Sequence, residues 1–368
     1  MKSKRSARAP DFILFVIVLL LLTVGIVMVY SSSYVYAQIA YADGAHFLKN
    51  QLIWAFVGIA GMLVVMNIDY KIYRKWAYPI FGIAVFLLLL LLVPGVGITI
   101  KDATRWIGVA GQRFQPSEIA KLALVIFLAK YLAERQNQIK QFVRGLAIPL
   151  LVVGVVCGLI LMQPDLGTAA TIAGTAFLML LAAGARIGHL GFLGLLGSGL
   201  AALAIMIEPY RMKRIMAFRD PWSDPLGKGF QTIQALLAVG SGRIFGAGLG
   251  QGRQKFLYLP EQHTDFIFAV LAEELGFIGT TFVLLLFVAF MWRGLKIAIK
   301  APDSFGALLG AGITVMVILQ AVINLGVVTG SLPVTGITLP FISYGGSSLT
   351  LNLLGIGILL NISRYVEE

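Results

Sequence analysis

Three acidic residues and one lysine are candidates for function, because they stand in or beside apolar runs, where charge is costly. Glu118 and Lys121 are three residues apart, so on a helix they share a face and can form an ion pair. Asp165 lies in the turn QPDLGT between two apolar runs, and Asp265 lies where a long polar stretch returns to an apolar run. These residue types move protons or bind cations and phosphates, so they predict a polar site within an apolar protein.

Asp265 is the best candidate for a catalytic group. A carboxylate at such a boundary is partly desolvated, which raises its pKa and favours a general base that works near neutral pH. The alternative is that Thr264 or Asp265 only caps the following helix. Glu273 and Glu274 lie further along, where one of them is expected to face a polar partner.

The other candidates also have a structural and a functional interpretation. Glu118 and Lys121 could hold two helices together, or they could form the polar floor of a cavity in which Lys121 binds a phosphate. Asp165 could cap the next helix, or it could orient a nearby basic group or bind a divalent cation. The residues alone leave these alternatives open.

The long polar stretch before Asp265 is basic, which is expected either of a solvated loop or of an anion site. Its candidate anion ligands are Arg211, Arg214 and Arg243. The glycine-rich run 240–254 resembles a phosphate-binding loop, in which backbone N–H groups approach an anion, although it has no Walker pattern. Scattered apolar residues suggest amphipathic segments at a membrane interface; they are Phe230, Phe245, Phe256, Leu257 and Tyr258.

The composition is that of a membrane protein. Of 368 residues, 58% are hydrophobic and 12% are charged, whereas soluble domains carry about 25% charged residues. Ten apolar runs can span a bilayer; they cover residues 11–32, 51–68, 77–94, 117–133, 145–162, 168–184, 188–207, 266–291, 305–326 and 346–362. We therefore predict an all-α polytopic membrane protein of about ten transmembrane helices, forming a single domain over residues 1–368, with a long extracellular loop at 208–265 between helices 7 and 8.

Lysine and arginine set the orientation. The N-terminal tail, residues 1–10, carries Lys2, Lys4, Arg5 and Arg8, and basic residues recur in every second loop, whereas the opposite short loops carry only Lys49, Lys101, Arg105 and Arg113. The positive-inside rule therefore places both termini in the cytoplasm. Membrane lipids explain much of the net charge of +12, so no nucleic acid is expected as a partner. The single cysteine and three dispersed histidines provide no metal cluster.

Residues 304–363 carry no charge, and within them the segment Asn324–Ser348 is rich in Gly, Pro, Ser and Thr. Irregular backbone at membrane depth must be buried in protein or line a cavity. We expect this segment to form a cavity wall that faces Asp265.

Five strings in order resemble the SEDS family (shape, elongation, division, sporulation) over essentially the whole chain. They are QPSE (115–118), QPDLGT (163–168), PEQHTDF (260–266), AEELGF (272–277) and the segment Asn324–Ser348. The segment Asn324–Ser348 is similar to the FtsW and SpoVE branch rather than to RodA-type members, because it contains VVTGSLPVTGITLPFISYGGSS.

The resemblance implies a peptidoglycan glycosyltransferase that polymerises lipid II at the outer face of the bacterial cytoplasmic membrane, in division or sporulation. It aligns Asp265 with the acid that polymerisation needs, Glu118 and Lys121 with paired cavity residues, and Asp165 with a motif acid. A class B penicillin-binding protein and other divisome proteins are the implied partners. A divalent cation, Mg²⁺ or Mn²⁺, is a candidate ligand of the leaving pyrophosphate, and no organic cofactor is expected.

Three rival functions are a lipid II flippase, a RodA-type polymerase of elongation, and a non-catalytic scaffold that recruits a transpeptidase. The acid at the end of the long outer loop favours the polymerase over the scaffold. The same loop, with no detected internal repeat, favours the polymerase over the transporter.

Overall fold

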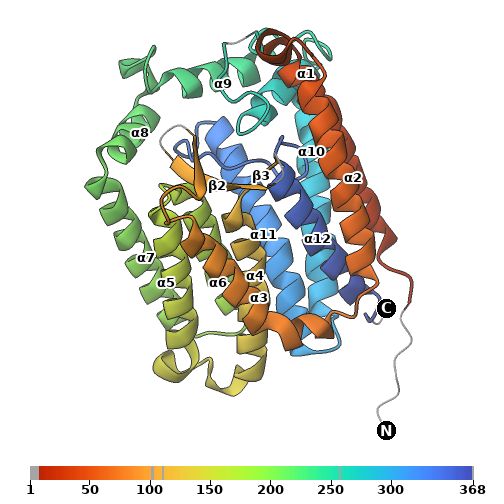
Figure 1. The fold of residues 1–368 in the computed structure, drawn as a ribbon, viewed down its shortest axis with the longest axis vertical. Coiled ribbons are helices and arrows are strands. Elements are labelled where there is room, and N and C mark those ends of the chain that lie inside the picture. Colours follow the sequence, from red (N-terminus) through yellow and green to blue (C-terminus); the bar gives the residue numbers. More distant parts are fainter. Residues whose placement is uncertain (1–7, 101–102, 110–111, 257, 367–368) are drawn as a thin grey trace.

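The computed structural model describes residues 8–100, 103–109, 112–256 and 258–366. Most of the cationic tail (Lys2, Lys4 and Arg5), the loop residue Lys101 and the apolar Leu257 therefore lie outside the described residues. The chain forms one elongated bundle of helices whose N- and C-terminal ends lie at the same end of the molecule (Figure 1).

Ten helices occupy the ten predicted runs, which confirms the polytopic helical fold. They are α1 (Phe12–Tyr41), α2 (His46–Met66), α3 (Lys71–Leu90), α4 (Pro116–Glu134), α5 (Ala147–Leu161), α6 (Leu166–Ala182), α7 (Ile187–Ile207), α10 (Ile267–Ile299), α11 (Ser304–Val328) and α12 (Gly346–Ser363). By length and composition, eight helices of the described residues can cross a membrane. The other two of the ten are α4, which carries charged residues, and α6, which has 17 residues.

Two helices are longer than their apolar runs. α1 continues to Tyr41 and α10 to Ile299, beyond the predicted ends at 32 and 291. Polar residues such as Ser31, Ser32 and Ser33 end the apolar run but not the helix, because a helix needs only its backbone hydrogen bonds to continue.

A small antiparallel sheet lies between α3 and α4, so the all-α prediction was incomplete. Its strands are β1 (Gly97–Ile100), β2 (Ala103–Val109) and β3 (Gln112–Phe114), in the order β1-β2-β3. Ile107 pairs with Gly97 on one side and with Phe114 on the other. Such short strands leave a weak signal in the sequence, because a strand is predicted from a run of alternating apolar and polar residues.

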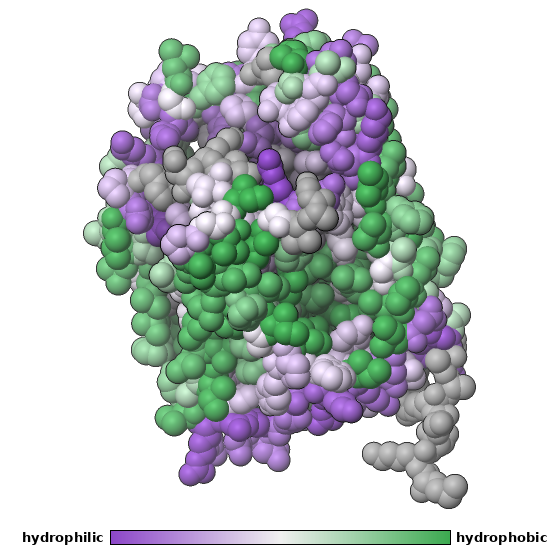
Figure 2. Space-filling model, in the orientation of Figure 1, coloured by the Kyte–Doolittle hydropathy of each residue, from purple (hydrophilic) through white to green (hydrophobic). Residues whose placement is uncertain are grey.

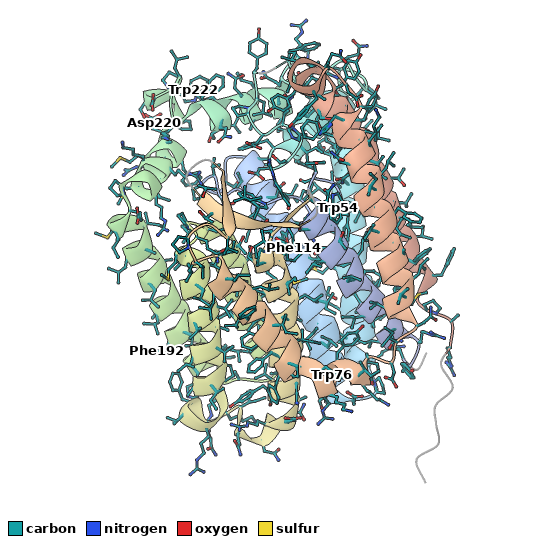
Figure 3. The ribbon with its side chains drawn as sticks, viewed as in Figure 1. Trp54, Trp76, Phe114, Phe192, Asp220 and Trp222 are labelled. Carbon is teal, nitrogen blue, oxygen red and sulfur yellow. The ribbon has the colours of Figure 1, made fainter. Side chains whose placement is uncertain are left out.

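The long loop between α7 and α10 contains two helices, α8 (Pro209–Arg219) and α9 (Phe230–Ser241), with a short helical turn, Pro221–Ser223, between them. Two further short helical turns, Gln136–Gln138 and Phe142–Leu146, lie between α4 and α5. α8 and α9 lie across the end of the bundle opposite the termini (Figure 1). Asp220 and Trp222 mark this end, and Trp76 marks the other (Figure 3).

The surface has a hydrophobic girdle between two polar ends (Figure 2). The girdle is the surface expected of a protein that spans a membrane, where apolar side chains face lipid. In the interior, α4 is buried along nearly its whole length, with α3, α6 and α11 packed against it. The protein is therefore a multi-pass membrane protein built around α4.

Residues 329–345, between α11 and α12, are irregular, as expected for the segment Asn324–Ser348, which we call the charge-free segment. α11 itself runs to Val328 and includes Asn324. Buried side-chain amides from α11 satisfy carbonyls of the irregular segment, which is how irregular backbone is tolerated inside a membrane bundle.

Candidate active site

The centre of the site is the part of the charge-free segment from Val334 to Thr338, which we call the 334–338 segment. Asn324 Nδ2 donates to the Ile337 carbonyl at 2.7 Å, and Gln320 Nε2 donates to the Thr338 carbonyl at 3.0 Å. Asn324 and Gln320 are each 1% exposed. These buried amides fix the backbone of the segment, so groups that touch it have defined positions.

Asp265 faces this segment. Its carboxylate Oδ2 would lie 3.6 Å from a Cβ atom placed on Gly336, and its backbone carbonyl accepts from Asn324 Nδ2 at 2.7 Å. The preceding residue is held as well, since Ser343 Oγ donates to the Thr264 carbonyl at 2.7 Å. The segment Asn324–Ser348 therefore lies opposite Asp265, as expected.

Asp265 is half-buried and does not act as the cap of α10. The N-cap residue of α10 is Phe266, and no side-chain hydrogen bond caps the helix. The capping alternative is therefore wrong for Asp265.

Glu118 and Lys121 form the predicted ion pair, and the pair reaches the same segment. Lys121 Nζ lies 2.8 Å from Glu118 Oε1, with both residues under 10% exposed. Lys121 also donates to Gln320 Oε1 at 2.8 Å, and Gln320 binds Thr338. Lys121 is thus one side chain away from the 334–338 segment.

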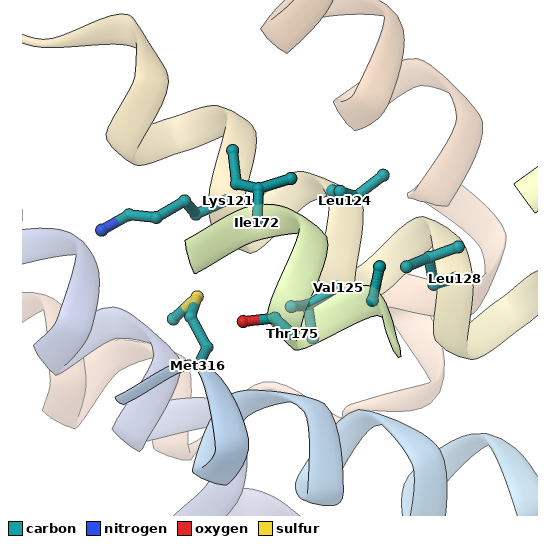
Figure 4. A pocket seen from close by; sticks show the side chains of 8 residues that line it. Lys121, Leu124, Val125, Leu128, Ile172, Thr175 and Met316 are labelled. Atoms are coloured by element: carbon teal, nitrogen blue, oxygen red, sulfur yellow. The ribbon is translucent and has the colours of Figure 1, made fainter. Parts of the chain in front are cut away.

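A small cavity lies beside the Lys121 stem, and apolar side chains dominate its lining. They include Leu124, Val125, Leu128, Ile172 and Met316, with Thr175 as the uncharged polar member. The charged end of Lys121 extends away from these residues (Figure 4). The cavity therefore suits apolar packing rather than a charged substrate group.

Asp165 both caps a helix and contacts a basic group, the two arrangements that the sequence suggested for it. It caps α6 by accepting from the Thr168 N–H at 3.0 Å, and its Oδ2 lies 3.7 Å from an Arg105 nitrogen. A Cβ atom on Gly167 would lie 2.9 Å from the Thr335 carbonyl oxygen, so this turn packs closely on the 334–338 segment.

Arg105, on β2, is a residue that the sequence did not single out. Besides Asp165, its side chain donates to the carbonyls of Gln163, at 3.1 Å, and Pro164. It thus holds three consecutive residues of the turn. The contact depends on the fold of the unpredicted sheet, so no pattern of residues along the chain indicated it.

The three loop arginines lie in different places. Arg214 donates to the Val334 carbonyl at 3.2 Å and so contacts the 334–338 segment. Arg211 is buried and donates to the Ala204 carbonyl of α7 at 2.8 Å. The backbone of Arg243 lies beside Phe277 in α10, whose N–H donates to its carbonyl at 2.8 Å.

The glycine-rich loop, which resembles a phosphate-binding loop in sequence, uses three of its N–H groups to bind carboxylates of the protein itself. The Gly250 N–H donates to Glu274 Oε2 at 3.0 Å. The N–H groups of Arg253 and Gln254 donate to Glu273, at 2.7 Å for Arg253. The loop does cradle anions, but the anions come from α10.

The described residues include no group of three or more His, Cys, Asp or Glu side chains that could hold a metal ion. They therefore do not fit a metal site built by the protein alone. The Mg²⁺ or Mn²⁺ expected from the sequence stays a prediction, and no chemical step below is assigned to it.

Comparison with known proteins identifies the family. Residues 12–368 match the model of the FtsW, RodA and SpoVE family, described as "Cell cycle protein". The chain belongs to this family.

Relatives within the FtsW/RodA/SpoVE family match along their full length. Stage V sporulation protein E of Bacillus subtilis is 53% identical over 358 residues, covering 97% of this chain and 98% of that protein. The probable peptidoglycan glycosyltransferase FtsW of Geobacter sp. (strain M18) is 46% identical over 368 residues, covering 99% of each chain.

Solved structures share the fold. A chain from work on "Structural coordination of polymerization and crosslinking by a peptidoglycan synthase complex" superposes with a TM-score of 0.78 at 34% identity, covering 98% of this chain and 99% of that one. The rod shape determining protein RodA of Thermus thermophilus superposes with a TM-score of 0.72 at 31% identity, covering 98% of each chain. Family members thus keep this fold at about one third identity.

Proposed function

We propose that this chain polymerises lipid II into glycan strands at the outer face of the bacterial cytoplasmic membrane. Family membership makes the chain a glycosyltransferase, since relatives over its full length are named peptidoglycan glycosyltransferases. The observation that carries the proposal is the half-buried Asp265, outside α10, facing a fixed segment that the cation Arg214 also contacts.

Asp265 is the proposed general base. It removes the proton from the 4-hydroxyl of the acceptor GlcNAc, and the oxygen attacks the anomeric carbon of the donor MurNAc. The new C–O bond forms as the bond between that carbon and the phosphate oxygen breaks, and undecaprenyl pyrophosphate leaves. The α-linked donor becomes a β-linked product in one displacement, so one base suffices, unlike the two-carboxylate scheme of retaining glycosidases.

Cations near the 334–338 segment are the proposed stabilisers of the leaving pyrophosphate, because fixed positive charge lowers the energy of a developing anion. Arg214 is the first choice, since it touches the segment that Asp265 faces. Lys121 is the second, through Gln320. Arg211, which donates to a carbonyl of α7, and Arg243, whose carbonyl accepts from α10, are the further candidates.

Glu118, Asp165 and Arg105 are proposed to shape the site. Glu118 keeps the Lys121 charge in place inside the bundle. Arg105 and Asp165 hold the turn that packs on Thr335. These residues act on substrate through the groups that they position.

Division or sporulation is the proposed cellular role, supported by the 53% identity to stage V sporulation protein E and the FtsW relatives. A class B penicillin-binding protein is the proposed partner. The similarity to a chain of a peptidoglycan synthase complex that coordinates polymerization and crosslinking supports it. Both termini are proposed to be cytoplasmic, which puts α8, α9 and Asp265 outside.

The Asp265→Asn variant tests the base, because it keeps the shape of the side chain and removes its ability to take a proton. With labelled lipid II and purified protein, we expect glycan polymer formation to fall by about 100- to 10,000-fold, the usual contribution of general acid–base catalysis. The matched control is Asp43→Asn, which changes an outer acid that pairs with Lys49 at the surface.

Two results would contradict the proposal. Polymer from a folded Asp265→Asn variant at the rate of the unchanged protein would remove Asp265 from the base role. Lipid II translocation in reconstituted vesicles without any polymer would instead favour the flippase.

A further inference from the structure

Three residues from separate parts of the chain meet in a cluster that the proposed reaction does not use: the buried Lys255 and Glu274 and the half-buried Ser31. We call this cluster the outer latch. Lys255 Nζ lies 2.9 Å from Glu274 Oε1, and the two side chains are 6% and 0% exposed. Ser31 Oγ lies 2.8 and 2.6 Å from the two carboxylate oxygens. With the Gly250 N–H at 3.0 Å, the Glu274 carboxylate joins α1, the outer loop and α10.

α10 is broken directly beyond the latch. Gly276 has φ 64° and ψ −162°, so the helix axis is interrupted between residues 267–275 and the remainder of α10. Backbone bonds from the outer loop bridge the break: Ala247 donates to the Glu273 carbonyl at 2.9 Å, and Phe277 donates to the Arg243 carbonyl at 2.8 Å. The outer part of α10 is therefore held by lateral contacts rather than by a continuous helix.

Asp265 stands at the other end of this outer part. Residues 266–274 are all buried, so they form a tightly packed unit whose two ends move together. Lys255 also begins the chain segment that leads to Asp265, and turns in this segment are closed by bonds from Leu259 to Gln254 and from Phe266 to Glu261. A displacement at Glu274 or Lys255 is therefore transmitted to Asp265.

We infer that Ser31, Lys255 and Glu274 are positioning residues, which hold Asp265 at the place where it can take the proton of the acceptor hydroxyl. The inference rests on the proposed base role of Asp265. Stability alone does not account for the latch, because a buried ion pair can often be replaced by apolar groups without loss of stability. Geometry does account for it, because a misplacement of about 1 Å at a reacting group costs about 100-fold in rate.

The test compares variants by kcat and KM for labelled lipid II, at equal amounts of folded protein. Lys255→Met removes the ammonium group, whereas Lys255→Arg keeps the positive charge. Ser31→Ala removes the hydroxyl that donates to the Glu274 carboxylate and keeps the ion pair of Lys255 with Glu274. Matched controls are Lys49→Met, in an exposed pair, and Ser32→Ala, a buried neighbour whose Oγ donates to the Val29 carbonyl of its own helix at 3.3 Å.

We expect Lys255→Met to lower kcat by about 100-fold with KM unchanged. Ser31→Ala should lower kcat less, and Lys255→Arg should keep most of the kcat of the unchanged protein. Faster amide hydrogen exchange in residues 258–266 should accompany the loss, with no change in α4. The controls should keep the kcat of the unchanged protein.

A folded Lys255→Met variant with unchanged kcat would overturn the inference. If Lys255→Met does not fold, Ser31→Ala decides in the same way, since an unchanged kcat there overturns the inference too. The two proposals fail separately: full activity of Asp265→Asn removes the base role, whereas an inactive Asp265→Asn beside a fully active Lys255→Met removes the latch alone.

Discussion

Glu118 and Lys121 bury two full charges inside α4, and each depends on the other. Lys121 gives one hydrogen bond to Glu118 and one to Gln320, so the pair is both satisfied and tied to the 334–338 segment. Breaking a buried pair by removing one partner leaves an uncompensated charge, which is far more costly than removing both.

Lys121→Met should therefore destabilise the protein by about 3–5 kcal/mol, and the double change Glu118→Gln with Lys121→Met should cost less. Denaturant unfolding in detergent, followed by tryptophan fluorescence, measures both. Lys49→Met, which breaks a solvent-exposed pair with Asp43, should change stability by about 0–1 kcal/mol. A single variant as stable as the double one would show that Glu118 finds another partner.

At the residue scale, the sequence indicated the polar pairs that are close along the chain. The spacing of Glu118 and Lys121 was enough to predict their ion pair, because helix geometry alone brings them together. Gln320 and Asn324 were visible as polar residues in an apolar run, but their targets lie in the irregular segment. Arg105 could not be found, because its contacts with residues 163–165 depend on the fold of the sheet.

The outer loop packs against α10 at the break in this helix, which lies at Gly276. A Cβ atom on Gly276 would lie 2.2 Å from the Gly246 nitrogen and 2.6 Å from the Ile244 carbonyl oxygen, and its φ of 64° is unfavourable for other residues. Both contacts are with backbone, which cannot rotate away as a side chain can. Only glycine therefore allows the loop to approach α10 so closely.

Gly276→Ala should lower the yield of folded protein and its midpoint of thermal unfolding, measured by size-exclusion chromatography in detergent over a temperature series. The control is Gly158→Ala in α5, where a Cβ atom meets no other atom within 4 Å. That change should be neutral or stabilise the helix by up to about 1 kcal/mol. Equal stability of Gly276→Ala and the unchanged protein would mean that the loop can withdraw from α10.

At the element scale, the apolar runs were sufficient to locate all ten helices, since each run must be long enough to cross a bilayer. The strands were missed because three to seven residues give too short a pattern. The glycine-rich run predicted that backbone N–H groups bind an anion, and N–H groups of this run do bind carboxylates. It could not reveal that Glu273 and Glu274 supply the anions, because those contacts are formed only in three dimensions.

The two polar ends of the molecule differ in their lysines and arginines, and this difference predicts which end faces the cytoplasm. At the end that holds both termini, Asp11 caps α1 and pairs with Arg293 of α10. The Arg8 N–H also donates to the Arg364 carbonyl at 3.0 Å, which joins the two ends of the chain. The opposite end carries α8 and α9 (Figure 1). The lysines and arginines place the end with both termini in the cytoplasm and the end with α8 and α9 outside.

Thiol labelling tests this orientation, because the chain has one cysteine, Cys157, which can be replaced by alanine. Single cysteines are then placed at two exposed positions, Ser223 after α8 and Asn137 after α4. We expect a membrane-impermeant maleimide to label position 223 in intact spheroplasts and position 137 only after permeabilisation, since Arg135 and Lys140 beside Asn137 favour the cytoplasmic side. The reverse pattern would place Asp265 in the cytoplasm and contradict polymerisation at the outer face, whatever the activity of the purified protein.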